Sequence, residues 1–144
     1  MRPKRNVLLY CMIPAAAGIM RFVIENRMHL RVDVAHTRED VQEYLAQHPP
    51  GYFEAAMVVR GVGEHEALGV CSDLRAAAVP TILLRQAGGP IEEREACADV
   101  CLTSNAGVAE WMERLRILTA RKRGPKKALR AVVAPVGESL GRAA

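Results

Sequence analysis

The segment Asn6-Val7-Leu8-Leu9-Tyr10-Cys11-Met12 decides the fold of this chain. It is a short, continuous apolar run, which is typical of a β-strand buried on both faces of a sheet. Ala55-Ala56-Met57-Val58-Val59 repeats this pattern, and Val79-Pro80-Thr81-Ile82-Leu83-Leu84 repeats it again. Strands of this kind belong to parallel sheets covered by helices, so we expect an α/β protein.

Segments with helical spacing separate these strands. Apolar residues with charges between them predict a helix from about Gly18 to Leu30. Thr37 and Asp40 predict a capping box, with Asp in place of the usual Glu, for a helix that stops before Pro49-Pro50. Ser104 or Asn105 is expected to cap the last helix. The remaining expected elements are strands over residues 30–35 and 99–103 and helices over residues 64–77 and 92–98.

Five strands alternating with five helices imply right-handed crossovers and a doubly wound parallel sheet. The open sheet with strand order 2-1-3-4-5 suits this length. Ligands of such sheets bind beyond the carboxyl ends of the strands. The residues expected at that edge are Cys11, Met12, Arg60, Arg85 and Ser104.

Length and charge divide the chain into two parts. Its 144 residues suit one domain, which we expect over residues 1–120. Residues 121–144 carry seven Lys or Arg and one Glu, a net +6, whereas the whole chain carries +4, so the first 120 residues sum to −2. The segment 121–144 is therefore expected to be a basic, flexible tail.

The cysteines indicate a cytoplasmic protein. Cys11, Cys71, Cys97 and Cys101 form no CxxC pair, and most lie in apolar patterns, so we expect free thiols in or near the core. This spacing does not favour zinc or another bound metal. No apolar run reaches the roughly 20 residues that a membrane-spanning helix needs. Pro14 and Gly18 interrupt the apolar stretch after the basic start, which argues against a signal peptide.

Over residues 5 to about 120 the ordered series of segments resembles the receiver domains of bacterial response regulators, which are flavodoxin-like. The resemblance is carried by three stretches: residues 6–14, residues 79–84, and Ala98-Asp99-Val100-Cys101-Leu102. In that family an acidic pair after the first strand holds Mg²⁺, and an Asp after the third strand accepts the phosphoryl group. A Thr or Ser after the fourth strand and a Lys after the fifth contact that group.

None of these functional residues is present here. The acidic pair corresponds to Cys11 and Met12, and the phosphoacceptor corresponds to Arg60. The hydroxyl position corresponds to Arg85, and the lysine to Ser104. Sulfur is a poor ligand for Mg²⁺, and a guanidinium is no nucleophile. The resemblance therefore implies a pseudo-receiver, which is no enzyme, takes no cofactor and is not phosphorylated.

Three functions remain open. The first is a signalling adaptor that binds a protein partner or a second copy of itself. The family's usual dimer face implies an interface at Trp111, Leu115 and Leu118, although their helical spacing is also typical of core residues.

The second function is a sensor of small anions, in which Arg60 and Arg85 bind the ligand together. In the simpler interpretation these arginines point to solvent or pair with nearby acidic residues such as Glu64, Glu66 or Glu92. The third function is a regulator that binds nucleic acid through the tail 121–144. A different flavodoxin-like module is disfavoured, because no phosphate-binding glycine motif is present.

Overall fold

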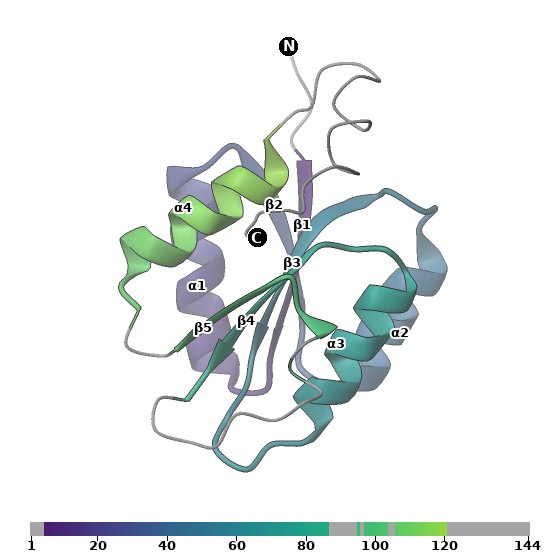
Figure 1. Ribbon diagram of the computed structural model, residues 1–144. Helices are drawn as coiled ribbons and strands as arrows, with labels where there is room; N and C mark the ends of the chain where they lie inside the picture. The colour runs from purple at the N-terminus through teal and green to yellow at the C-terminus, as the bar shows by residue number, and fades with distance from the viewer. Residues whose placement is uncertain (1–4, 87–94, 96, 104–105, 121–144) are drawn as a thin grey trace, which may run out of the picture.

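The computed structural model describes residues 5–86, 95, 97–103 and 106–120. These residues form a five-stranded parallel sheet in the order β2-β1-β3-β4-β5 (Figure 1). The strands are β1 (Arg5–Cys11), β2 (Leu30–Ala35), β3 (Phe53–Val59), β4 (Thr81–Arg85) and β5 (Val100–Thr103). The helices are α1 (Pro14–Arg27), α2 (Arg38–Gln47), α3 (Glu66–Ala76) and α4 (Val108–Thr119). The predicted fold class and strand order are confirmed.

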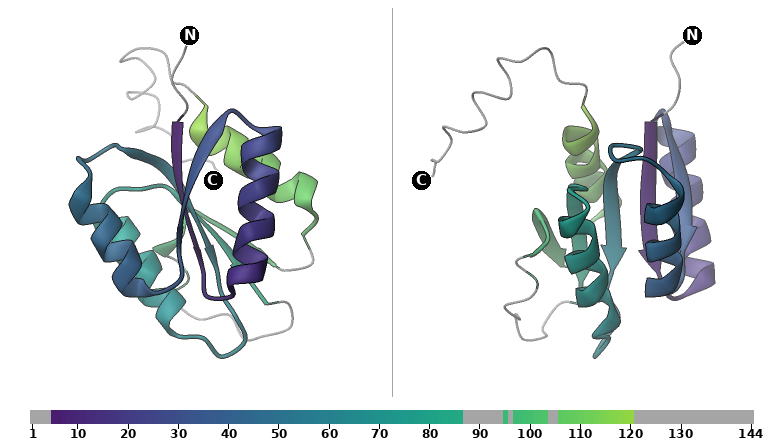
Figure 2. Two further views of the ribbon diagram at one scale, coloured as in Figure 1. Left: turned by 180° about the vertical axis from the view of Figure 1, so that it is seen from behind. Right: turned by 90° about the vertical axis from the view of Figure 1, so that its right-hand side faces the viewer.

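Helices cover both faces of the sheet (Figure 2). α1 and α4 lie on one face and α2 and α3 on the other. Residues of β1 alternate between the two layers: Val7 and Leu9 join the core cluster of α1 and α4, whereas Leu8 and Tyr10 join that of α2 and α3. β1 is therefore buried on both sides, as its continuous apolar sequence predicts.

The starts of α1 and α2 follow from local sequence signals. Pro14 occupies the first turn of α1, where its missing N–H is not needed, so the helix begins four residues before the predicted start at Gly18. α2 begins with the predicted capping box: Thr37 Oγ1 accepts from the Asp40 amide at 3.1 Å, and Asp40 Oδ2 accepts from the Thr37 amide at 3.3 Å. The predicted end of this helix before Pro49 is also confirmed.

The last helix starts later than predicted. Its N-cap is Gly107, so the expected cap at Ser104 or Asn105 is wrong. Ala106 and Gly107 first continue the chain in a turn, in which the Ala106 amide donates to Thr103 O at 2.9 Å. Most of the helix predicted over residues 92–98 lies outside the described residues. In that stretch Glu95 and Cys97 are in 3₁₀ conformation.

The tail 121–144 also lies outside the described residues, so its predicted separation from the domain stays a prediction. Among the residues that are described, no helix is long and apolar enough to cross a membrane.

Candidate functional site

The carboxyl ends of β1, β3 and β4 meet at one edge of the sheet, where the first candidate residues lie. Arg60 directly follows β3, and its amide donates to Leu84 O at 2.9 Å. Arg85 is the last residue of β4. Neighbouring parallel strands thus bring these two arginines to the same edge, as the sequence predicts.

Both arginines bind one buried carboxylate, that of Glu95. Arg60 Nη1 lies 2.7 Å from Glu95 Oε2, and Arg85 Nε lies 3.0 Å from Oε1 and 3.1 Å from Oε2. Arg60, Arg85 and Glu95 are only 7%, 8% and 4% exposed. Buried charges persist only when they are paired and hydrogen-bonded, so this triad holds the turn at Glu95 against the ends of β3 and β4.

A second acidic residue, Glu64, completes the polar network of this edge. Its main-chain oxygen accepts from Arg60 Nε at 2.8 Å, and its Oε1 accepts from the Gly61 amide at 2.8 Å. Its Oε2 accepts from the hydroxyl of Tyr10, a buried residue of β1. Burial, and next the hydrogen bond to Glu64, raise the pKa of Tyr10, so the phenol stays protonated and remains a donor.

Two sulfur-containing residues, Cys11 and Met12, lie at the end of β1, where the resemblance to receiver domains places the ligands of Mg²⁺. Cys11 is buried, its Sγ donates to Ile13 O at 3.6 Å, and burial raises its thiol pKa. Its carbonyl oxygen accepts from His36 Nδ1 at 3.0 Å. Met12 is 49% exposed. Neither residue supplies the carboxylate oxygens that Mg²⁺ prefers.

The described part of the chain holds no group of three His, Cys, Asp or Glu side chains placed to bind a metal ion. Among the described residues, Glu64 and Glu95 place carboxylates at this edge, and both accept hydrogen bonds from the protein itself. Arg60 has no free lone pair with which to attack a phosphoryl group. The described residues of this edge can therefore stabilise one fixed carboxylate.

The acidic partner of the arginines was not predicted. Glu64, Glu66 and Glu92 were the candidates, but Glu66 accepts from the Arg38 amide at 2.7 Å and Glu92 lies outside the described residues. Glu95 belongs to the same acidic stretch of sequence as Glu92, so an acidic partner from this stretch was foreseeable. Which carboxylate turns inward depends on the path of the chain after β4.

Ser104, the residue that corresponds to the lysine of the resemblance, lies outside the described residues.

The residues expected at a dimer face lie mostly inside the domain. Trp111 and Leu115 are buried in the core cluster, and Leu118 is half-buried against it. Buried side chains are less available to a second copy, so the burial of Trp111 and Leu115 favours the core role that their helical spacing also predicts, and an interface there stays a prediction. An unexpected apolar surface appears on α1, where Ile19 and Phe22 are exposed.

Sequence comparison finds no relative: no protein-family model matches this chain, and no curated protein matches it significantly. Structural comparison finds many similar folds.

Three solved structures show this likeness. A putative response regulator from Chloroflexus aurantiacus is 18% identical with a TM-score of 0.67, covering 82% of this chain and 99% of that one. The receiver domain of the Francisella response regulator 1452 is 16% identical with a TM-score of 0.66, covering 81% and 97%. The response regulator TrrA from Thermotoga maritima, solved in complex with Mg²⁺ and BeF, is 14% identical with a TM-score of 0.68, covering 79% and 98%.

Identities of this size establish the fold alone. The matches span nearly the whole of each matched chain and agree with the observed strand order. This chain therefore has the CheY-like receiver fold of the two-component response regulators.

Proposed function

We propose that this chain is a receiver-like signalling domain that is not phosphorylated and acts through contacts with proteins. The observation that supports this most is the buried triad of Arg60, Glu95 and Arg85, because Arg60 stands where the family carries its phosphoacceptor. Cys11 and Met12 stand where the family carries its Mg²⁺ ligands.

The triad also places a negative charge at this edge. The resemblance implies that in an active receiver the corresponding negative charge is a phosphoryl group, which the residues after the fourth and fifth strands contact. Here Glu95 is an anion that the chain itself supplies, and it is already hydrogen-bonded to both arginines. We therefore infer a domain with one fixed arrangement at this edge, presenting a constant surface to its partner.

A sensor of free anions through Arg60 and Arg85 is less well supported. The pair is able to bind a carboxylate, but Glu95 occupies that position, so an external anion has to displace it. Nucleic-acid binding through the tail 121–144 stays a prediction, since the tail lies outside the described residues.

The four cysteines are free thiols, which agrees with the proposed cytoplasmic location.

The test is to offer the full chain a phosphoryl donor. The protein is incubated with acetyl phosphate and Mg²⁺ and analysed by intact mass. In parallel, its melting temperature is measured with Mg²⁺ and fluoroberyllate. A receiver with an intact acidic pair and Asp serves as the positive control. We expect no phosphoryl adduct and no Mg²⁺-dependent shift for this chain, whereas a stable acyl phosphate on any residue would overturn the proposal.

A third arm of the same experiment distinguishes a sensor of small anions from the proposed signalling domain. Sulfate, phosphate and a nucleotide are titrated at constant ionic strength while the melting temperature is followed. We expect the response to match that of chloride, because Glu95 already fills the site. A saturable shift with one of these anions, lost in Arg85→Met, would favour the sensor instead.

A further inference from the structure

Helix α1 is apolar on two opposite faces. Its inner face carries Ala17 and Ile24, which are fully buried against the sheet. Its outer face carries Ile19 and Phe22, each 67% exposed. A surface helix is normally polar on the side that faces away from the core, and a helix that is apolar all round is normally covered on all sides. The outer face of α1 therefore lacks a cover within the described domain.

The exposed residues of the outer face, three of them apolar and one an asparagine, follow the spacing of a helix–helix seam. Ala15, Ile19, Phe22 and Asn26 recur at alternating steps of four and three residues, and all four are exposed. This is the a/d pattern of a coiled coil, and Asn at such a position is a known device for setting register. Met12 precedes the helix at the same spacing and is also exposed. We call these five residues the α1 seam.

The seam carries a protrusion and a matching gap one turn apart. Phe22 projects from the outer face, whereas Gly18 lies beside the seam with no heavy atom within 4 Å of where its Cβ would be. Two copies of α1 packed antiparallel place each Phe22 over the Gly18 of the other copy. Such an arrangement is related by a two-fold axis, which is the usual symmetry of a dimer.

Charges do not oppose this pairing. Around the antiparallel axis the flanking positions are Ala16 opposite Val23 and Gly18 opposite Glu25, so no like charges meet at the centre of the seam. The first turn of α1 holds no acidic residue and no side-chain cap. Antiparallel packing brings the carbonyl end of one helix beside this uncompensated amide end of the other, which is electrostatically favourable.

We propose that the α1 seam is the homodimer interface of this protein, formed by antiparallel packing of α1 against α1 of a second copy. The inference rests on the proposed function in that it names the surface through which the domain makes protein contact. It also places that surface on α1 and not on α4, whose Trp111 and Leu115 are buried.

The available area determines the strength of the dimer. The large apolar residues of the seam, Met12, Ile19 and Phe22, are each about half to two-thirds exposed, so each offers on the order of 100 Å². Two copies then bury roughly 600 Å² through these side chains, below the approximately 1,200 Å² at which stable interfaces begin. The dimer is therefore expected to be reversible and to depend on concentration.

The first measurement is the mass of the full chain in solution. Sedimentation velocity from micromolar to millimolar concentration should show a monomer–dimer equilibrium. Ile19→Glu and Phe22→Glu should each weaken the dimer by at least about tenfold, since each buries a carboxylate at the centre of the seam. Val62→Glu is the matched control, because Val62 is also apolar and even more exposed but belongs to the connection between β3 and α3 and not to the α1 seam, and it should leave the equilibrium unchanged.

A second variant distinguishes specific packing of the α1 seam from non-specific hydrophobic association. Gly18→Leu makes the outer face more apolar while it fills the gap that receives Phe22. Specific packing predicts a weaker dimer, and non-specific association predicts a stronger one. Ile19→Asn and Phe22→Ser provide milder changes, and far-ultraviolet circular dichroism verifies that every variant is folded.

The proposal is overturned if the full chain stays monomeric at millimolar concentration, or if a dimer persists undiminished in both glutamate variants. It is also overturned if Gly18→Leu strengthens association. These outcomes leave the proposed function untouched, because the latter depends on phosphoryl transfer and fluoroberyllate binding, which are measured separately. Conversely, a phosphoryl adduct would overturn the proposed function, whereas the monomer–dimer equilibrium of the untreated chain is measured independently by sedimentation.

Discussion

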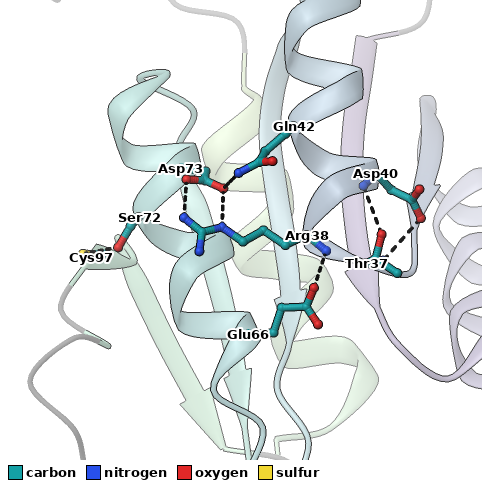
Figure 3. Close-up of polar contacts among 8 residues, drawn as sticks. All are labelled: Thr37, Arg38, Asp40, Gln42, Glu66, Ser72, Asp73 and Cys97. Carbon is teal, nitrogen blue, oxygen red and sulfur yellow. Dashed lines mark hydrogen bonds and ion pairs between the residues drawn. The ribbon is translucent and has the colours of Figure 1, made fainter.

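The guanidinium of Arg38 lies directly against Gly69, across the contact between α2 and α3. A Cβ added at Gly69 would stand 2.5 Å from Arg38 Nη1, closer than real contacts allow. In this position Arg38 binds Asp73 with two hydrogen bonds, Nε to Oδ2 at 2.8 Å and Nη2 to Oδ1 at 2.9 Å (Figure 3). The missing side chain at Gly69 is therefore what lets this ion pair join the two helices.

Gly69→Ala is predicted to have two opposing effects that nearly cancel. Alanine is favoured over glycine in a helix by about 1 kcal/mol. The new methyl group displaces Arg38, however, and a partly exposed pair of this kind contributes about 0.5–1 kcal/mol. In an Arg38→Ala background only the first effect remains, so Gly69→Ala should stabilise that variant by about 1 kcal/mol. Urea unfolding of the four proteins measures this, and equal effects in both backgrounds would contradict the interpretation.

The same ion pair makes stability depend on pH. Hydrogen bonds from Arg38, opposed by burial and supported by Gln42, lower the pKa of Asp73 in the folded protein. A lowered pKa contributes stability that is present above the unfolded-state value, near 4, and that is lost as the pH falls through the folded-state value. Asp73→Asn should therefore lose less stability than the wild type on acidification. Urea midpoints measured at neutral pH and below the ordinary Asp pKa should converge between the two proteins at acid pH.

Much of the fold was predictable because it depends on short-range patterns. The apolar run at β1, the Thr37–Asp40 capping box and the stop before Pro49 each reflect a local rule, and each is confirmed. The start of α1 was misplaced because its apolar outer face hides the usual amphipathic boundary, although Pro14 marks it. The N-cap at Gly107 offers no side-chain signal, whereas Ser104 and Asn105 do.

The candidate site was only partly predictable, for a physical reason. Parallel topology alone brings Arg60 and Arg85 to one edge, and this was foreseeable from their positions after two neighbouring strands. The partner Glu95 follows Arg85 by ten residues, in the connection between β4 and β5, and its inward direction depends on tertiary packing. In the same way, burial of Trp111 and exposure of Ile19 depend on which side of each helix meets the sheet. Both helices carry more apolar residues than one face requires.

Ala78→Gly is predicted to stabilise the protein. α3 ends in a Schellman motif: the Val79 amide donates to Leu74 O at 2.9 Å, and the Ala78 amide donates to Arg75 O at 3.0 Å. Ala78 has a φ of 60°, the left-handed conformation that glycine normally provides at this position. Removing its Cβ should raise the free energy of unfolding by about 0.5–1 kcal/mol.

Ala76→Gly is the matched control for this substitution. Ala76 is exposed and still lies within α3, so glycine there should lower the free energy of unfolding by about 0.5–1 kcal/mol. Thermal or urea unfolding of both variants measures the difference. A loss of stability in Ala78→Gly comparable to that in Ala76→Gly would show that the left-handed position carries no strain.

The cysteines should differ in their reaction with iodoacetamide. Burial raises the pKa of Cys71 to about 12, and burial also raises the pKa of Cys11. Both thiols are protected from solvent, whereas Cys101 on β5 is exposed. Peptide mapping of the native protein should show Cys101 alkylated well before Cys11 and Cys71, with all equally modified in urea. Rapid native alkylation of Cys11 would instead support a redox role for that residue.

The buried triad gives the largest predicted effect. Glu95→Ala removes the carboxylate that Arg60 and Arg85 share, leaving two buried guanidiniums close together, and should lower the free energy of unfolding by about 3–5 kcal/mol. Trp111 is the only tryptophan and lies in the core, so its fluorescence reports unfolding in urea. Glu113→Ala breaks an exposed, solvent-screened ion pair with Arg116 and should change stability far less.

Two further measurements distinguish charge from packing at the triad. The first measurement tests whether repulsion between the two guanidiniums causes the instability of Glu95→Ala. In that case sulfate at constant ionic strength should restore part of the stability, because a free oxyanion then takes the place of the carboxylate between the guanidiniums. Combining Glu95→Leu with Arg60→Met and Arg85→Met should likewise recover most of it, since well-packed apolar residues often replace buried ion networks without loss. Equal instability of Glu95→Ala in sulfate and chloride, together with an unfolded triple variant, would show that the turn at Glu95 is held by other contacts.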